Sequence, residues 1–325
     1  MTTFLQRAAL ALAVMLLGAC SGGGDGGSGS PPAAAIVVNS LLDSAAPPAG
    51  TVTLRSALAS AASGQTIEFD GTLSGGTIAL SIVADEHTVL KGEVMGIRNE
   101  PSGPVSYLVG YFDRDYGRSA LVARKDVVID ASKLPAGITI AWAGTTPARV
   151  LAVSGDLTLA NVTITGGHSV TENISASNPN QPWTLARGGA VAVWGVARLS
   201  DCRLHDNHVE GDFDSSRDRG AFGGAVYADI VQMQRCVVSG NSVLGGGAAG
   251  GGVYSVGGAE DSRSVSSIDR STISGNAIRG LFAYGAGVYS DVVPDSGVHV
   301  VDAGAAYARE RGADCIVSVG GGSAI

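Results

Sequence analysis

Short runs in which hydrophobic and polar residues alternate recur along the middle of the chain. Three of them, at residues 150–153, 157–159 and 162–164, are separated by only a few residues. This alternation is typical of half-buried strands, and the spacing leaves no room for crossover helices. Tight-hairpin dipeptides are also missing between the runs. The pattern therefore predicts coils that turn in one sense and stack their strands in parallel, about 4.8 Å apart.

Two motifs repeat over a longer distance. The first contains two glycines shortly before a valine and occurs at residues 188–191, 223–226, 251–253 and 285–288, with valine spacings of 35, 27 and 35. The second ends in Asn207, Asn241 and Asn276, which are 34 and 35 residues apart. Such a period indicates a solenoid, propeller or array. In stacked coils we expect the asparagines to form a ladder at a turn, in left-handed backbone, and the glycines to supply positive φ.

The second motif also carries the cysteines Cys202 and Cys236 at matching positions, followed by Ser271. Stacking predicts an inward row of small residues. The Cα atoms of the two cysteines would lie about 4.8 Å apart, which is within disulfide range. In-register stacking, however, directs both Cβ atoms the same way. A disulfide and a pair of reduced thiols therefore both remain open.

Composition supports a folded body. The 325 residues include 48 glycines, yet 45% are hydrophobic, which is too many for a disordered chain. Aromatic residues make up only 5%, so the core is not built on large rings. The net charge of −8 provides no basic surface, so we do not expect nucleic acid as a partner. No two of the four cysteines have zinc-site spacing.

The first 20 residues have the parts of an export signal. Arg7 is the only charge, and residues 8–17 form an apolar run too short to span a bilayer. The sequence Leu-Gly-Ala-Cys that ends at Cys20 resembles the bacterial lipoprotein signal, and residues 21–35 resemble its Gly/Ser/Pro tether. The resemblance implies lipid on Cys20 and a membrane anchor. Ser21 favours the outer membrane or cell surface of a Gram-negative bacterium. The alternative is an ordinary signal peptide with a chance cysteine.

The repeats at residues 36–290 resemble right-handed parallel β-helix proteins of the pectin-lyase-like superfamily, similar to polymorphic outer-membrane passengers. The segments 127–130 and 157–167 look like their opening coils. Residues 53–64 fit the short helix that covers the first coil, with Thr53 as N-cap and Gly64 at the end. The resemblance implies an all-β solenoid. Residues 85–126 do not follow the repeat, and we interpret them as an insertion.

Residues 291–325 have a different character. Residues 298–311 predict an amphipathic helix, residues 314–319 a buried strand, and Gly320, Gly321, Gly322 and Ser323 a glycine turn. This order resembles iron-containing alcohol dehydrogenases, in which the turn approaches NAD. The family's metal ligands are missing, so the resemblance implies a vestigial dinucleotide turn in a truncated fragment. A chimeric or truncated reading frame is one interpretation, and an αβ piece that caps the solenoid is the other.

One charged cluster is the candidate loop for a ligand or an ion. Its carboxylates are Asp201, Asp206, Asp212, Asp214 and Asp218. Clustered carboxylates bind Ca²⁺ or act as acid and base in polysaccharide lyases and hydrolases. The alternative is a solvated loop, because the closing Glu of a calcium loop is missing and no second copy appears one coil away.

Other residues that could carry chemistry have simpler interpretations. We interpret His168 as a turn residue rather than a base. We interpret Trp142, Trp183 and Trp194 as packing residues rather than sugar platforms. No catalytic residue and no resident cofactor or metal is assigned, and Ca²⁺ is the one ion considered.

Two functions remain. The first is a non-enzymatic surface scaffold for adhesion or for binding a polysaccharide or a host or cell-surface ligand. The second is a polysaccharide lyase or hydrolase on the same fold. Three or more carboxylates from adjacent coils within metal-binding reach would favour the enzyme, whereas a smooth face would favour the scaffold.

Overall fold

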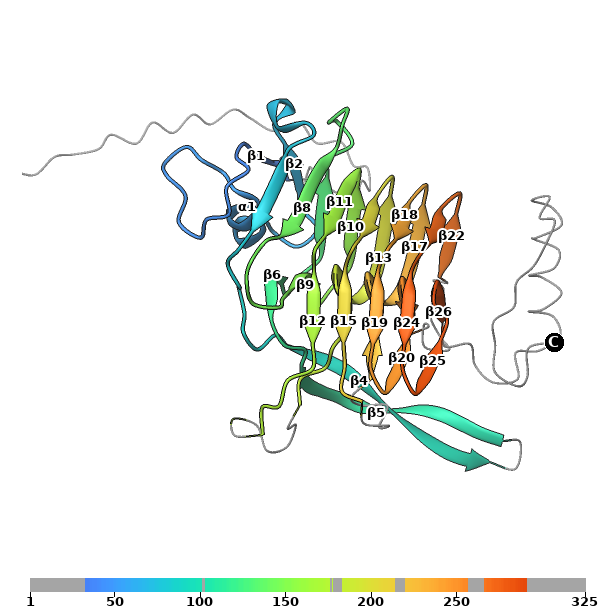
Figure 1. Ribbon diagram of the computed structural model, residues 1–325. Coiled ribbons are helices and arrows are strands. Elements are labelled where there is room, and N and C mark those ends of the chain that lie inside the picture. The colour runs from blue at the N-terminus through green and yellow to red at the C-terminus, as the bar shows by residue number, and fades with distance from the viewer. Residues whose placement is uncertain are drawn as a thin grey trace, which may run out of the picture. The chain divides into compact units, whose positions relative to one another are not determined.

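A computed structural model of the chain (Figure 1) describes residues 33–100, 103–175, 177, 183–213, 220–256 and 266–290. The chain divides into two units, Met1–Ala33 and Ala34–Ile325, and the fold below belongs to the second. Several predicted features lie outside the described residues: Cys20 and its signal, nearly all of the tether, the tail with its glycine turn, Asp214 and Asp218.

The described part is mainly β, and nearly all of its strands pair in parallel. An eleven-stranded sheet contains β1 (Ile36–Val38), β2 (Thr66–Phe69), β6 (Ser119–Ala123), β7 (Val127–Asp130), β9 (Arg149–Val153), β10 (Leu157–Ala160), β13 (Val191–Ser200), β17 (Val226–Gln234), β21 (Val253–Ser255), β22 (Ser267–Asp269) and β26 (Val288–Ser290). A six-stranded sheet contains β3 (Thr77–Leu80), β8 (Ile138–Trp142), β11 (Val162–Thr165), β14 (Arg203–His205), β18 (Val237–Ser239) and β23 (Thr272–Ser274).

Two smaller parallel sheets complete the set. The four-stranded sheet contains β12 (His168–Val170), β15 (His208–Glu210), β19 (Ser242–Leu244) and β24 (Ala277–Arg279). The three-stranded sheet contains β16 (Ala221–Phe222), β20 (Gly247–Ala249) and β25 (Phe282–Tyr284).

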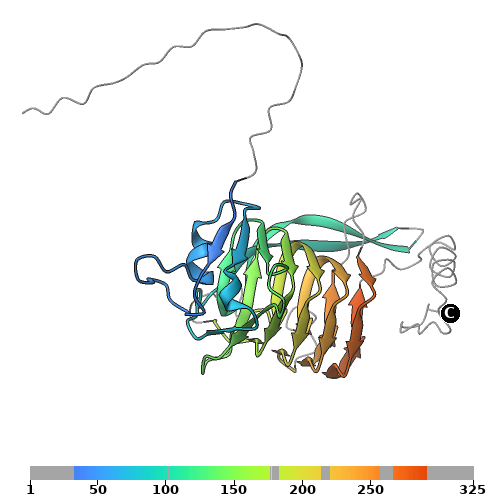
Figure 2. The ribbon, with the colours of Figure 1, turned by 90° about the horizontal axis from the view of Figure 1, so that it is seen from above.

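From β13 to β21, successive strands visit the four parallel sheets in turn. The chain runs from β13 through β14, β15 and β16 and then returns to the eleven-stranded sheet at β17. The next circuit runs through β18, β19 and β20 to β21. Figure 2 shows the strands of successive circuits standing side by side. This arrangement of partly curled parallel sheets is consistent with a β-helix or solenoid-like fold. It also contains the three strands predicted from alternation, as β9, β10 and β11.

Register places like residues on like residues in the core. Ile140, Ile164, Leu204 and Val238 occupy one row of the six-stranded sheet, and each is at most 2% exposed. The residues on either side of each row member, along its own strand, face outward and are half-buried or exposed. A buried aliphatic side chain contributes about 1.5–3 kcal/mol, so such rows hold neighbouring circuits together.

The predicted helix is present as α1 (Leu54–Ser60). The Thr53 side chain accepts a hydrogen bond from Ser56 N, and Ser56 Oγ accepts one from Thr53 N, which forms a capping box. The predicted end at Gly64 is wrong. The backbone already becomes extended at Ala61, and Gly64, with φ +71°, instead makes the following turn, where its N–H bonds to Asp126 O.

The segment interpreted as an insertion contains an antiparallel hairpin of β4 (Val89–Glu100) and β5 (Gly103–Asp115). The predicted limits, 85–126, are too wide. Strand β6 pairs in parallel with β9 and belongs to the eleven-stranded sheet. Four of its five residues are buried, so packing against β9 returns the chain to the main body before residue 126.

Turn conformations partly follow the prediction. Positive φ occurs at Gly188, Gly223 and Gly285, the first glycine of three copies of the first motif, and at Gly250, directly before the third copy. The asparagines of the second motif are not left-handed, so that expectation is wrong. The residue before each of them makes the turn instead, namely Asp206, Gly240 and Gly275, with φ of 54–65°. Each asparagine amide is then directed along the stack.

Candidate functional site

A shallow groove crosses the outer face of the eleven-stranded sheet over β10, β13, β17 and β22. Its volume is about 260 Å³, and its lining residues are Thr158, Arg198, Leu199, Ser200, Gln232, Met233, Gln234, Ser267 and Asp269. Leu199 and Met233 alternate with the polar residues and are buried, so the side chains that face outward along the groove are polar.

Parallel register arranges these polar side chains in two rows. Thr158, Arg198, Gln232 and Ser267 form one row, and Ser200, Gln234 and Asp269 form the other. Adjacent members of a row belong to neighbouring strands, about 4.8 Å apart. The groove therefore presents hydrogen-bonding groups at a regular spacing across several circuits.

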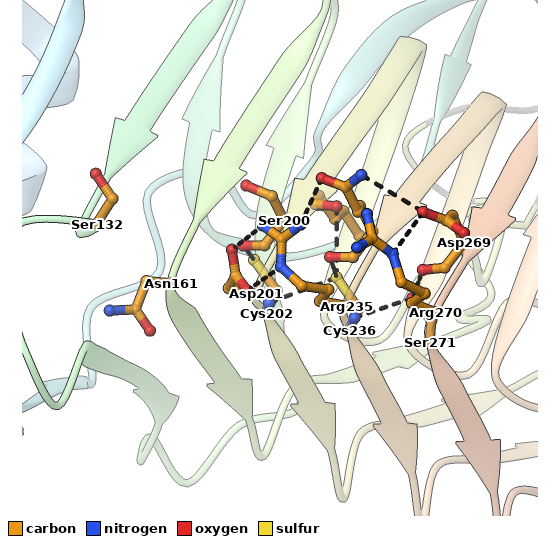
Figure 3. A network of polar contacts seen from close by, with 12 residues as sticks. Ser132, Asn161, Ser200, Asp201, Cys202, Arg235, Cys236, Asp269, Arg270 and Ser271 are labelled. Atoms are coloured by element: carbon orange, nitrogen blue, oxygen red, sulfur yellow. Dashed lines mark hydrogen bonds and ion pairs between the residues drawn. The ribbon is translucent and has the colours of Figure 1, made fainter.

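An ion-pair network borders the groove at the turns that follow β13, β17 and β22 (Figure 3). Arg235 contacts Asp201 through two bonds, Nε–Oδ1 at 2.7 Å and Nη2–Oδ2 at 2.6 Å, and also donates to Gln234 Oε1. Arg270 pairs with Asp269 at 2.9 Å. Hydrogen bonding from Arg235 lowers the pKa of Asp201. A carboxylate held this way is a poor proton acceptor, so the network suits binding better than acid–base catalysis.

The predicted acidic cluster is spread over several turns in the described part of the chain. Asp201 precedes β14, Asp206 lies between β14 and β15, and Asp212 follows β15. Asp206 contacts His205 at 2.8 Å. Asp214 and Asp218 lie outside the described residues, so a calcium loop stays a prediction. Over the described ranges, one set of three residues could hold a metal ion. It includes none of these aspartates and contains a single carboxylate.

That set consists of His168, His208 and Glu210, whose ligand atoms all lie within 4.8 Å of one another. His168 is the first residue of β12 and pairs with His208 of β15, with ring centroids 4.7 Å apart. The interpretation of His168 as a turn residue is therefore wrong. Burial lowers the pKa of both imidazoles, and for His168 the charge of His208 lowers it further. The sequence contained a weak signal for this pair. Each histidine directly follows a residue at the same position of its circuit, which is Gly167 for His168 and Asn207 for His208.

Asparagine side chains connect three neighbouring circuits. The Asn207 amide donates to Asn241 Oδ1 at 3.0 Å, and the Asn241 amide donates to Asn276 Oδ1 at 2.9 Å. Each acceptor oxygen also takes the main-chain N–H of the preceding asparagine. This ladder fixes the register of the circuits and serves structure rather than ligand binding.

The cysteines form a second ladder of the same kind, visible in Figure 3. Cys202 and Cys236 are buried free thiols. Cys202 N donates to Cys236 Sγ at 3.4 Å, and Cys236 N donates to Ser271 Oγ at 2.9 Å. The stack therefore holds two thiols and a hydroxyl in equivalent positions.

The tryptophans with described contacts pack within the body. Trp142 is 9% exposed, and its indole N–H bonds to Thr146 O. Trp194 packs against Tyr116, with ring centroids 4.2 Å apart, and donates to the Tyr116 hydroxyl. Neither arrangement is a row of rings along the groove.

Comparisons with models of protein families, with curated proteins and with solved structures gave no match. Among the described residues, no helix has the length and apolar character needed to cross a membrane.

Proposed function

We propose that this chain is an exported lipoprotein whose body, residues 36–290, is a right-handed parallel β-helix that binds an extended polar ligand without catalysis. The strand order from β13 to β21, which visits each parallel sheet in turn and then returns to the eleven-stranded sheet, supports the β-helix. The lipoprotein-like sequence ending at Cys20 supports export and anchoring at the outer membrane or cell surface. The ligand class we propose is a polysaccharide or another cell-surface polymer.

The polar groove carries this proposal. Its two rows repeat hydrogen-bonding groups from one circuit to the next, and a repeating face is complementary to a ligand that itself repeats. The row with Arg198 and Gln232 supplies donors to hydroxyl or carboxylate oxygens. Arg198 is also tied to Asp156 at 2.7 Å, so its guanidinium is oriented before a ligand arrives.

A polysaccharide lyase or hydrolase is the alternative on the same fold. The hydrolase requires at least one carboxylate free to exchange a proton, and the lyase requires a general base. At the groove, Asp201 is paired with Arg235 and Asp269 with Arg270. This pairing favours binding over turnover.

Binding of the purified protein to a panel of neutral and acidic polysaccharides tests the proposal. Arg198→Ala should weaken binding of the polymer that the wild type retains by about 10–100-fold, since a hydrogen bond to a charged group contributes about 1.5–3 kcal/mol. Gln232→Ala should weaken it by about 2–10-fold, since a neutral hydrogen bond contributes about 0.5–1.5 kcal/mol. Arg203→Ala is the matched control, because Arg203 is exposed on β14 in a different sheet.

Three outcomes would contradict the proposal. The first is a protein that retains no polymer, and the second is equal weakening by Arg198→Ala and Arg203→Ala. The third is the release of shortened or unsaturated fragments from the bound polymer, which would favour the enzyme instead.

A further inference from the structure

We propose that His168, His208 and Glu210 form a binding site for a divalent transition-metal ion, with Zn²⁺ as the preferred ion, on the four-stranded sheet. The site is distinct from the polar groove, which lies on the eleven-stranded sheet. The proposal therefore stands or falls independently of ligand binding in the groove. Figure 1 shows β12, β15 and β19, the strands that build the site, side by side.

Strand geometry places the three side chains together on the outer face. His168 and His208 are register partners on adjacent parallel strands. Glu210 lies two residues after His208, and alternate residues of a strand share a face. The residues between them, Ser169 and Val209, are 2% and 0% exposed and point inward. The parallel register of β12 and β15 therefore brings two imidazoles and one carboxylate together.

Both imidazoles have a nitrogen available to a metal. His208 Nδ1 lies 2.7 Å from Ser242 Oγ, and when Nδ1–H donates to that hydroxyl, Nε2 keeps its lone pair. His168 Nε2 is buried and has no hydrogen-bond partner. A buried ring nitrogen without a partner is destabilising, and a metal ion would satisfy it.

The distances from the Glu210 carboxylate to the two imidazoles fit a metal ion after a small adjustment. Glu210 Oε2 lies 3.6 Å from His168 Nε2 and 3.9 Å from His208 Nε2. Ligand atoms about 2.0–2.2 Å from tetrahedral Zn²⁺ are about 3.3–3.6 Å apart. The Glu210 side chain is 48% exposed, so it can rotate on the solvent side and move its carboxylate oxygen by a few tenths of an ångström.

The donor set determines which ions fit. Imidazole nitrogens with one carboxylate suit Zn²⁺, Cu²⁺ and Ni²⁺, whereas Ca²⁺ and Mg²⁺ require six or more oxygen ligands or nearly complete hydration. Three protein ligands leave a fourth position for water. A bound ion would connect β12 to β15 and so hold two successive circuits in register.

Isothermal titration of the purified, chelator-treated protein, without a histidine tag, tests the proposal with ZnCl₂ as the probe. We expect one equivalent of Zn²⁺ to bind and to raise the melting temperature, and CaCl₂ to do neither. His208→Ala and Glu210→Gln should each weaken Zn²⁺ binding at least 100-fold and abolish the rise in melting temperature. Ser242→Ala should weaken it by about 10–100-fold through loss of the bond that orients His208.

His205→Ala is the matched control and should leave Zn²⁺ binding unchanged, because His205 lies on β14 and contacts Asp206. Circular dichroism of each apo variant checks folding, and Glu210→Gln keeps the size of the side chain if an alanine variant fails to fold. The proposal is overturned by absence of Zn²⁺ binding, by equal binding in folded His208→Ala and Glu210→Gln variants, or by loss of binding in His205→Ala.

Discussion

Replacing Asn241 with alanine tests the stacked register directly. The Asn241 side chain accepts bonds from the main-chain N–H and the amide of Asn207, both at 3.0 Å. It donates to Leu204 O at 3.0 Å and to Asn276 Oδ1 at 2.9 Å. Asn241 is completely buried, so water cannot replace these partners without rearrangement of the surroundings.

The expected loss can be worked out bond by bond. The Asn207 N–H loses its acceptor, which costs about 1–3 kcal/mol for a buried group. The Asn207 amide keeps Ile164 O and His205 O as acceptors, so the loss of its bond to Asn241 adds little. The two bonds that Asn241 donates contribute about 0.5–1.5 kcal/mol each. We expect a total decrease in the free energy of unfolding of about 4 kcal/mol. For a body of this size, that lowers the melting temperature by about 8–16 °C.

Urea and thermal unfolding of wild type and variant measure this difference. Asn173→Ala is the matched control, because Asn173 is exposed and its side chain accepts only a local bond from Ser175 N among the contacts described. The control should change stability by less than about 0.5 kcal/mol. Equal midpoints for the two variants would refute the reasoning that the ladder supports the stack.

Three further predictions address other features. Arg149→Met should lower the unfolding midpoint far more than Arg203→Ala, since the completely buried Arg149 guanidinium donates to main-chain carbonyls and to two serine hydroxyls; equal midpoints would contradict this. Cys236→Ser should cost less than about 1 kcal/mol, because Ser271 already occupies the equivalent position one strand further on, and a larger loss in urea unfolding would argue against equivalence. Cys20→Ala should abolish incorporation of a fatty-acid probe in cells, and an unlabelled wild type would remove the basis for lipid anchoring.

Local patterning was sufficient for much of the architecture. Alternation over four residues predicts β10 and β11, because a strand with one buried face requires it. Strand β9 was predicted in the same way, but all five of its residues are buried. Thr53 predicts the start of α1, because a side-chain oxygen that caps a helix acts over three residues. The repeat spacing of Asn207, Asn241 and Asn276 predicts that their amides stack, since equal spacing brings equivalent positions together.

The limits of the hairpin segment could not be predicted from local patterning. Residues 119–123 look like any apolar strand, and only their pairing with β9 assigns them to the eleven-stranded sheet. The left-handed positions were also misassigned, because the same turn position is an aspartate in one circuit, Asp206, and a glycine in the next two, Gly240 and Gly275. A conformation imposed by the position in a circuit does not require one kind of residue.

Alternation and repeat length were enough to predict short stacked strands, because both patterns act locally and recur along the chain. Which side chains come together in a site depends on the packing of whole circuits. His168 and His208 are 40 residues apart, whereas the later asparagines repeat at 34 and 35, so the intervening loop disguises their equivalence. Register between β12 and β15 is set by the packing of whole circuits, and that packing brings the two imidazoles and Glu210 together.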